Sequence, residues 1–114
     1  MSTFRPTTFT VYPDGYEDAV NIDRGMWAIE VTLTNDREDT WAVRWLAQTL
    51  NRKGEWEYEP QPSSRTKGFL KRCRFTQADA LARAARVVEG LRLNGGTLAE
   101  VSARVAARRE GGEG

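Results

Sequence analysis

Histidine is absent from this 114-residue chain, and cysteine occurs only once. Without histidine the chain lacks the commonest general base and the commonest metal ligand in proteins, so every histidine-dependent triad is excluded. The lone Cys73 excludes an internal disulfide and a zinc site built from several cysteines. We therefore predict no catalytic residues, no metal site and no cofactor, and we expect a non-enzymatic protein without a small-molecule substrate.

Long apolar runs are missing as well. No stretch approaches the roughly 18 apolar residues of a membrane-spanning helix, and the first residues do not resemble a secretory signal. These absences predict a cytoplasmic protein that does not interact with membranes. The length fits one domain, which we place at residues 1–110, and the glycine-rich residues 111–114 are expected to form a disordered tail.

Charge is distributed unevenly along the chain. Residues 1–64 contain 6 Lys or Arg and 11 Asp or Glu, a net charge of −5, whereas residues 65–114 contain 11 and 5, a net charge of +6. Such asymmetry is typical of a two-faced molecule or of one that self-associates through opposite faces. Ion pairing between the two halves is the alternative.

The strongest strand signals are two alternating segments, 26–34 and 41–46, on either side of a charged loop. If Thr34 pairs with Thr40, the numbers of paired residues sum to 74. The predicted pairs are Leu33 with Trp41, Val31 with Val43, Ile29 with Trp45, and Glu30 with Arg44. The first three pairs share one apolar face, and the fourth is a favourable charged pair on the other face.

Two further segments alternate in the same way, 8–12 and 55–59. The partner of Trp56 depends on the length of the preceding loop: a four-residue loop places it beside Thr49, and a three-residue loop ending in a left-handed Gly54 places it beside Leu50. We favour Thr49, because this register leaves the alternate glutamates of 55–59 in solvent.

Two helix starts follow. Thr76 with Asp79, and Thr97 with Glu100, have the spacing of capping boxes, and the first opens a helix at Gln77 that we expect to cover the apolar face of the hairpin. Residues 69–75 fit either a short strand or a helical turn. The order of elements predicts an α+β fold: an antiparallel sheet of three or four strands, followed by two C-terminal helices packed on one face.

Residues 40–90 resemble a group of small uncharacterised proteins from actinobacteria, their phages and their mobile elements. The sequence words that carry this resemblance are GEWEYEP at residues 54–60 and FLKRCRF at residues 69–75. The resemblance implies an origin in phage or mobile-element biology, and it implies no activity.

A fold-level similarity to the arm-type DNA-binding domains of tyrosine integrases rests on fewer residues. Those domains have three strands and then a helix, with a W-x-x-R strand and an aromatic residue before an Ala-rich helix. Trp41, Arg44 and Phe75 fit this outline, whereas the insertion at 55–68 and its glutamates depart from it. The resemblance concerns the fold alone, and a shared fold does not by itself give function.

The best binding candidate is the segment 65–74, in which five of the ten residues are basic. The candidate nucleic-acid-binding residues are Arg65, Lys67, Lys71, Arg72 and Arg74. Phe69 and Phe75 lie among them, and cations interleaved with aromatic rings can neutralise phosphates and stack on bases. The alternative is an exposed loop whose Phe69, Cys73 and Phe75 pack inward.

Other candidate chemistry is weaker. Glu55, Glu57 and Glu59 share one strand face and could hold a divalent cation, but we interpret them as a solvated strand edge. The basic neighbours of Cys73 could lower its pKa, but we interpret it as a small buried apolar residue. The sequence thus predicts a phage or mobile-element accessory protein that binds a host or phage protein, or forms a homo-oligomer; the alternative is a nucleic-acid-binding protein that uses residues 65–74.

Overall fold

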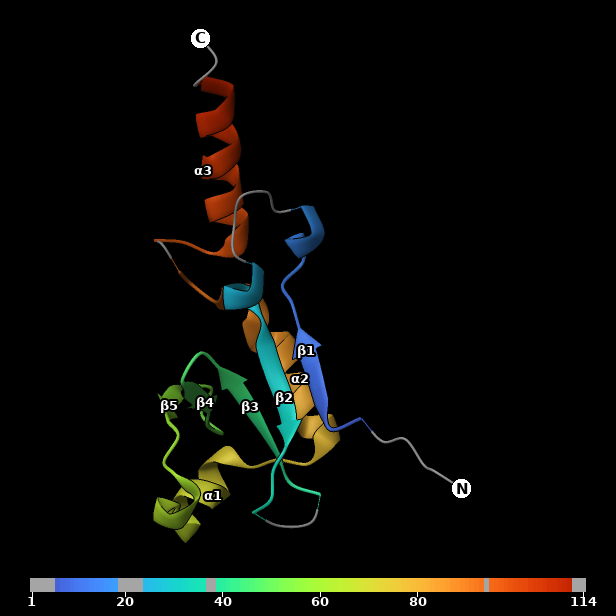
Figure 1. Cartoon of the computed structure of the whole chain (residues 1–114), viewed down its shortest axis with the longest axis vertical. Coiled ribbons are helices and arrows are strands. Elements are labelled where there is room, and N and C mark those ends of the chain that lie inside the picture. The colour runs from blue at the N-terminus through green and yellow to red at the C-terminus, as the bar shows by residue number, and fades with distance from the viewer. Residues whose placement is uncertain (1–5, 19–23, 37–38, 94, 112–114) are drawn as a thin grey trace.

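A computed structural model of the chain describes residues 6–18, 24–36, 39–93 and 95–111. They form an α+β fold with a five-stranded antiparallel sheet in the order β1-β2-β3-β4-β5 (Figure 1). The strands are β1 (Thr8–Val11), β2 (Ile29–Leu33), β3 (Trp41–Trp45), β4 (Gln48–Leu50) and β5 (Trp56–Tyr58). The α-helices are α1 (Lys67–Cys73), α2 (Gln77–Val87) and α3 (Leu98–Gly111).

The β2–β3 hairpin has the predicted register. Glu30 lies opposite Arg44, and Leu33 lies opposite Trp41. The turn is closed as expected, because the Thr34 amide donates to the Thr40 carbonyl at 2.9 Å. Aromatic and β-branched side chains then share one face, which is buried in the core.

The register of β4 and β5 corrects the prediction for Trp56, which pairs with Leu50 and not with Thr49. The expectation failed because β3 and β4 are joined by a two-residue turn in which Leu46 adopts a φ of 55°. This tight turn puts Leu50, not Thr49, on the core side of the sheet. Trp56 therefore packs against the core, whereas Tyr58 is 73% exposed.

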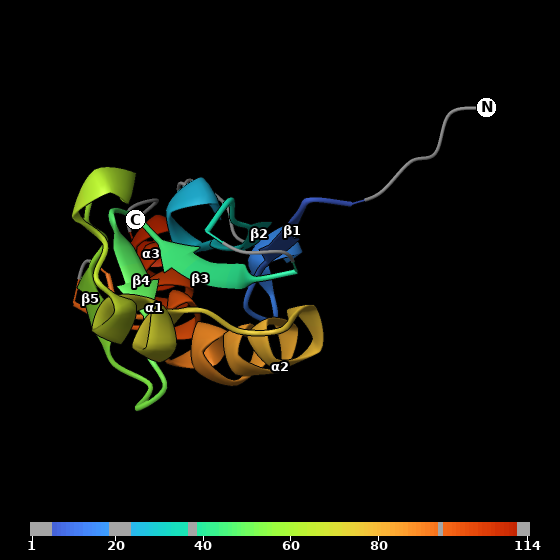
Figure 2. The same cartoon turned by 90° about the horizontal axis from the view of Figure 1, so that it is seen from below.

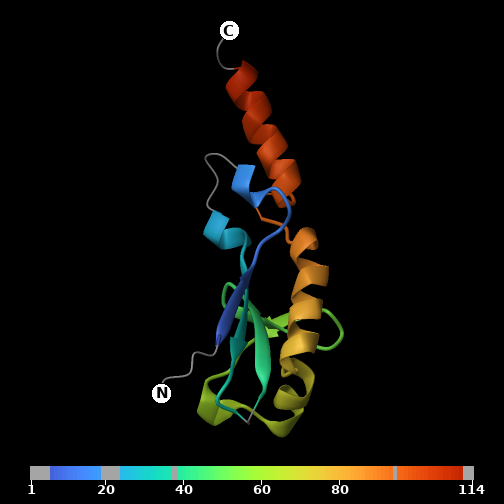
Figure 3. The same ribbon diagram turned by 90° about the vertical axis from the view of Figure 1, so that its right-hand side faces the viewer.

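Helix α2 covers the core face of β2 and β3, as predicted (Figures 2 and 3). The Thr76 hydroxyl caps it by accepting from the Asp79 amide at 3.2 Å. Ala80 and Ala84 are fully buried against the sheet, and their small side chains allow the helix to approach it closely.

The additional helix is α1, in the region where the sequence was compatible with either a short strand or a helical turn. Thr66 caps α1 at its start. The chain returns to extended backbone only after the end of the helix, where Phe75 forms a β-bridge with Trp41. The sheet thus has more strands than the predicted three or four, and there are three helices instead of two.

The C-terminal helix α3 begins at the expected capping box, in which the Glu100 amide donates to the Thr97 hydroxyl at 3.3 Å. It continues beyond the sheet along the long axis of the molecule (Figures 1 and 3). Gly111, where we expected the tail to start, is its last residue, and residues 112–114 lie outside the described part of the chain. No helix within the described residues is long and apolar enough to span a membrane.

Candidate anion-binding groove

Three of the five predicted binding residues are held in ion pairs within the protein. Arg65 contacts Asp36 at 3.0 Å, and Arg72 contacts Glu57 at 3.0 Å. Arg74 contacts both Asp36, at 2.6 Å, and Glu59, at 2.7 Å. The acidic partners all come from the first half of the chain, so the charge asymmetry of the sequence is in large part neutralised by pairing between its halves.

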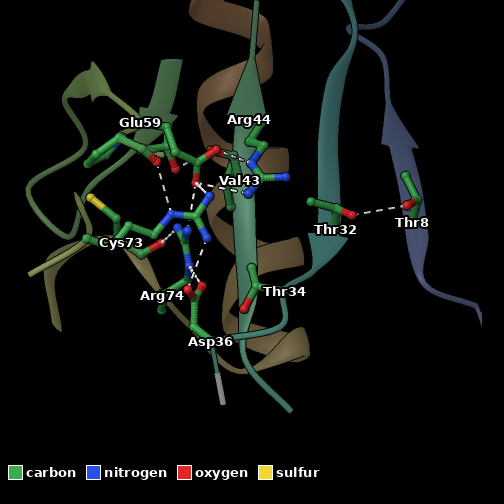
Figure 4. A network of polar contacts seen from close by, with 12 residues as sticks. Thr8, Thr32, Thr34, Asp36, Val43, Arg44, Glu59, Cys73 and Arg74 are labelled. Atoms are coloured by element: carbon green, nitrogen blue, oxygen red, sulfur yellow. Dashed lines mark hydrogen bonds and ion pairs between the residues drawn. The ribbon is translucent and has the colours of Figure 1, made fainter. Parts of the chain in front are cut away.

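Arg74 is the centre of this network (Figure 4). Its side chain is only 3% exposed, and it also donates to the Cys73 carbonyl at 3.0 Å. Glu59 is shared with Arg44 of β3, whose Nη2 donates to it at 3.0 Å. Burial opposes ionisation of Asp36, but hydrogen bonds from Arg74 and Arg65 hold its pKa below the ordinary value. The network therefore ties the segment before α1 and the residue after it to one face of β3.

Glu57 does not form the solvated edge that we expected. It accepts hydrogen bonds from Arg72 and from the Asn51 amide group, which together lower its pKa to about 2. Cys73 is fully buried, as predicted, and burial raises the pKa of its thiol to about 12. Its basic neighbours therefore do not make it a reactive thiolate.

The two phenylalanines of the segment are core residues. Phe69 and Phe75 are each 3% exposed. The guanidinium carbon of Arg74 lies 5.2 Å from the ring centre of Phe69, and those of Arg52 and Arg83 lie 5.0 and 4.6 Å from that of Phe75. Neither ring is available to stack on a base.

The remaining two predicted residues, Lys67 and Lys71, are exposed. They lie one turn apart on α1, and both line a cleft of about 670 Å³ that Arg52 also lines. Phe69 and Cys73, also one turn apart, occupy the opposite, buried side of the helix. The same helical periodicity that buries the apolar pair thus presents the two lysines to the cleft.

Arg52 is positioned by the β4–β5 turn. Asn51 is buried, and its side-chain oxygen accepts from the amides of Lys53 and Glu55 at 2.9 and 3.0 Å. Gly54 completes the turn with a φ of 82°, in the left-handed region that glycine adopts without strain. Arg52 then donates to the Lys71 carbonyl at 2.6 Å and to the Arg74 carbonyl at 2.9 Å, which fixes the turn against the end of α1.

A second, smaller hollow of about 230 Å³ continues from Arg52 toward α2. It is lined by Lys53 of the turn and by Arg83 and Arg86 of the helix. The β4–β5 turn lies beside α2 in Figure 3, and Arg83 Nη1 donates to the Arg52 carbonyl at 3.1 Å.

A third hollow, of about 470 Å³, shares Gly54, Arg86 and Val87 with the second and ends at Trp45, Trp56 and Arg92. The first hollow shares Arg52 with the second, and we call the three hollows together the cationic groove. Its basic residues are Lys67 and Lys71 of α1, Arg52 and Lys53 of the β4–β5 turn, Arg83 and Arg86 of α2, and Arg92 beyond that helix.

The charges of the cationic groove are only partly balanced. Arg83 and Arg52 share Asp79, at 3.0 and 3.9 Å, and Arg92 lies 3.4 Å from Glu100. Among the described residues, no ion pair involves the other four cations of the groove. These four are Lys53, Lys67, Lys71 and Arg86.

Sequence reasoning found only the α1 part of this groove. Arg52 and Lys53 were assigned to a turn, and Arg83 and Arg86 to a helix. One signal was present: Asp79, Arg83 and Arg86 follow one another at helical spacing on a stripe separate from the buried alanines. The sequence pattern does not indicate that this stripe lies beside the β4–β5 turn.

Comparisons with protein-family models, with curated proteins and with solved structures found no match to this chain. The resemblances to actinobacterial and phage proteins and to integrase arm domains therefore stay predictions. Within the residues that the structure describes, no cluster of three or more acidic or cysteine side chains could hold a metal ion.

Proposed function

We propose that the protein binds nucleic acid without catalysis, and that the phosphates lie along the cationic groove. The observation that carries this proposal is a set of four cations without an ion pair, which come from three separate segments and line hollows that share residues with one another; the four are Lys53, Lys67, Lys71 and Arg86. The arginines that are neutralised, Arg65, Arg72 and Arg74, contribute to the fold instead of to binding.

The physical basis is release of the counterions that condense on a polyanion. Each phosphate neutralised on a single strand contributes a slope of about −0.7 to the dependence of log K on log salt concentration. Four contacts give a slope of about −2.8, so affinity should fall about 50-fold between 50 and 200 mM salt. Carboxylates are few in the groove: Asp79 is already shared, and Asp36 and Asp39 lie only at the α1 end.

The test is fluorescence anisotropy with labelled DNA at low salt, using a matched pair of double variants. Lys67→Gln with Lys71→Gln removes two cations of the groove, and Arg72→Gln with Arg104→Gln removes two exposed cations outside it. We expect the first variant to bind at least tenfold more weakly and the second to bind like the wild type. Equal losses would place binding elsewhere, and no binding up to tens of micromolar protein would refute the proposal.

An acidic protein segment is the other polyanion that such a groove could take. Its chemistry differs from that of nucleic acid, because carboxylates are spaced irregularly and carry no bases. Displacement of labelled DNA by polyglutamate at equal charge concentration would show that the groove selects charge alone and would contradict a nucleic-acid function.

A protein partner, the function first predicted from the sequence, is the second candidate. It is favoured by two exposed large apolar residues next to Trp45. Leu46, which is 57% exposed, follows Trp45 in the chain, and Met26, which is 41% exposed, accepts a hydrogen bond from Trp45 Nε1 at its backbone carbonyl. If this surface joins two copies of the chain, light scattering will give twice the monomer mass, and Leu46→Asp will return the monomer mass.

A further inference from the structure

The Trp end of the cationic groove differs chemically from the rest. Trp45 and Trp56 face each other there, with ring centres 5.6 Å apart and planes inclined by 51°. Trp45 is nearly buried, and its indole nitrogen is satisfied by the Met26 carbonyl at 2.9 Å. Trp56 is only half-buried and lines the hollow of about 470 Å³ together with Val87 and Leu91.

Two arginines border the same hollow. Arg86 lines both this hollow and the neighbouring part of the groove, and Arg92, which lies 3.4 Å from Glu100, lines this hollow as well. A hollow of this size that is lined by two indole rings and by two arginines suits a flat ring system that carries anionic groups. A nucleobase within a strand, with its two flanking phosphates, has this chemistry.

We propose that the ligand is single-stranded nucleic acid and that one base enters this hollow and stacks on Trp56. The inference rests on the proposed function, because the phosphates are brought to Trp56 by the cationic groove. A paired base in a duplex exposes only its edges, so it cannot place a face against the indole ring. Stacking on an aromatic ring is tolerant of sequence, since every base has a π-face.

The aromatic residues proposed from the sequence do not compete for this role. Phe69 and Phe75 are buried under guanidinium groups. Tyr58 is exposed on the same strand as Trp56, but it lines none of the hollows of the groove. It therefore provides a control: an exposed ring of β5 outside the proposed site.

The experiment measures anisotropy for a labelled 12-nucleotide poly(dT) strand and for a 12-base-pair duplex, over a salt series. Wild type, Trp56→Leu, Trp56→Phe and Tyr58→Ala are compared after thermal melts have established that each is folded. Because a stacked base is lost, Trp56→Leu should bind the single strand between about 5- and 150-fold more weakly than the wild type. Trp56→Phe should retain most of the affinity, and Tyr58→Ala all of it.

The salt slope separates stacking from charge. Trp56→Leu should lower affinity and leave the slope unchanged, because it removes no cation. Equal affinity of the wild type for strand and duplex, or an unchanged affinity of Trp56→Leu, would overturn the stacking site and leave the proposed phosphate binding intact. A loss with Tyr58→Ala equal to that with Trp56→Leu would overturn the choice of Trp56. Absence of binding to both ligands would remove the proposed function as well.

Discussion

Arg74→Met should destabilise the fold far more than Arg72→Met, although the two arginines are two residues apart in the same basic segment. The Arg74 side chain is 3% exposed and contacts Asp36 and Glu59, which are 10% and 15% exposed. Its removal leaves two largely buried carboxylates short of a partner, and breaking a buried pair in this way costs about 3–5 kcal/mol. Because Arg65 and Arg44 still contact these carboxylates, we expect about 3 kcal/mol, near the lower limit.

Arg72 is the matched control. Its side chain is 52% exposed, and its partner Glu57 keeps the hydrogen bond from Asn51. Exposed pairs contribute about 0–1 kcal/mol, so Arg72→Met should cost no more than that. For a domain of this size, this difference in unfolding free energy means that Arg74→Met should melt roughly 10 °C or more below Arg72→Met.

The assay is urea unfolding followed by tryptophan fluorescence, with thermal melts as a second probe. Both variants remove one positive charge from one segment, so an effect of net charge alone is the same in each. Equal destabilisation by the two substitutions would refute the description of Arg74 as the centre of a buried network.

Three further predictions concern acid stability, thiol reactivity and backbone strain. The pKa of Glu57 is about 2 in the folded protein and 4.5 in the unfolded chain, so its contribution to stability is present above pH 4.5 and is lost as the pH falls toward 2. The urea midpoints of the wild type and of Glu57→Gln should therefore converge as the pH falls through this range. A constant difference between the two midpoints would contradict the lowered pKa. Cys73 should react with a thiol reagent at pH 8 only after unfolding, and rapid labelling of the native protein would show that the thiol is not buried. Leu46, with a φ of 55°, should be replaceable by Asn with a gain of roughly 0.5–1 kcal/mol, and a loss in thermal melts would indicate that its side chain has a packing role.

The parts of the fold that could be predicted are those with two independent local signals. The β2–β3 register followed from the alternation and from the placement of Glu30 opposite Arg44, and both agreed. Likewise, α2 and α3 start where a Thr precedes an acidic residue at the spacing of a capping box. In each case the decisive contacts join residues that are close in sequence or that pair across a single hairpin.

The parts that could not be predicted depend on contacts between distant residues or on an unusual turn. The β3–β4 turn contains Leu46 and Ala47 in place of the Asn-Gly or Asp-Gly that marks a tight hairpin, so β4 was not recognised and the partner of Trp56 was wrong. The acidic partners of Arg74 lie 38 and 15 residues away from it.

The candidate site was predicted in part for the same reason. Composition identified a basic segment, but it did not separate Lys67 and Lys71, which line a cleft, from arginines that the fold neutralises. The other cations of the groove come from a turn and from a helix, and only the tertiary structure brings them together.

Phosphate binding by the cationic groove is tested by the salt dependence of single-strand binding, measured for the wild type and for a variant in which Lys53, Lys67, Lys71 and Arg86 are all changed to Gln. We expect a wild-type slope of log K against log salt near −2.8 and a slope close to zero for the variant, since about 0.7 is lost with each phosphate contact. A variant that retains the wild-type slope would contradict the claim that the cationic groove is where this protein binds nucleic acid.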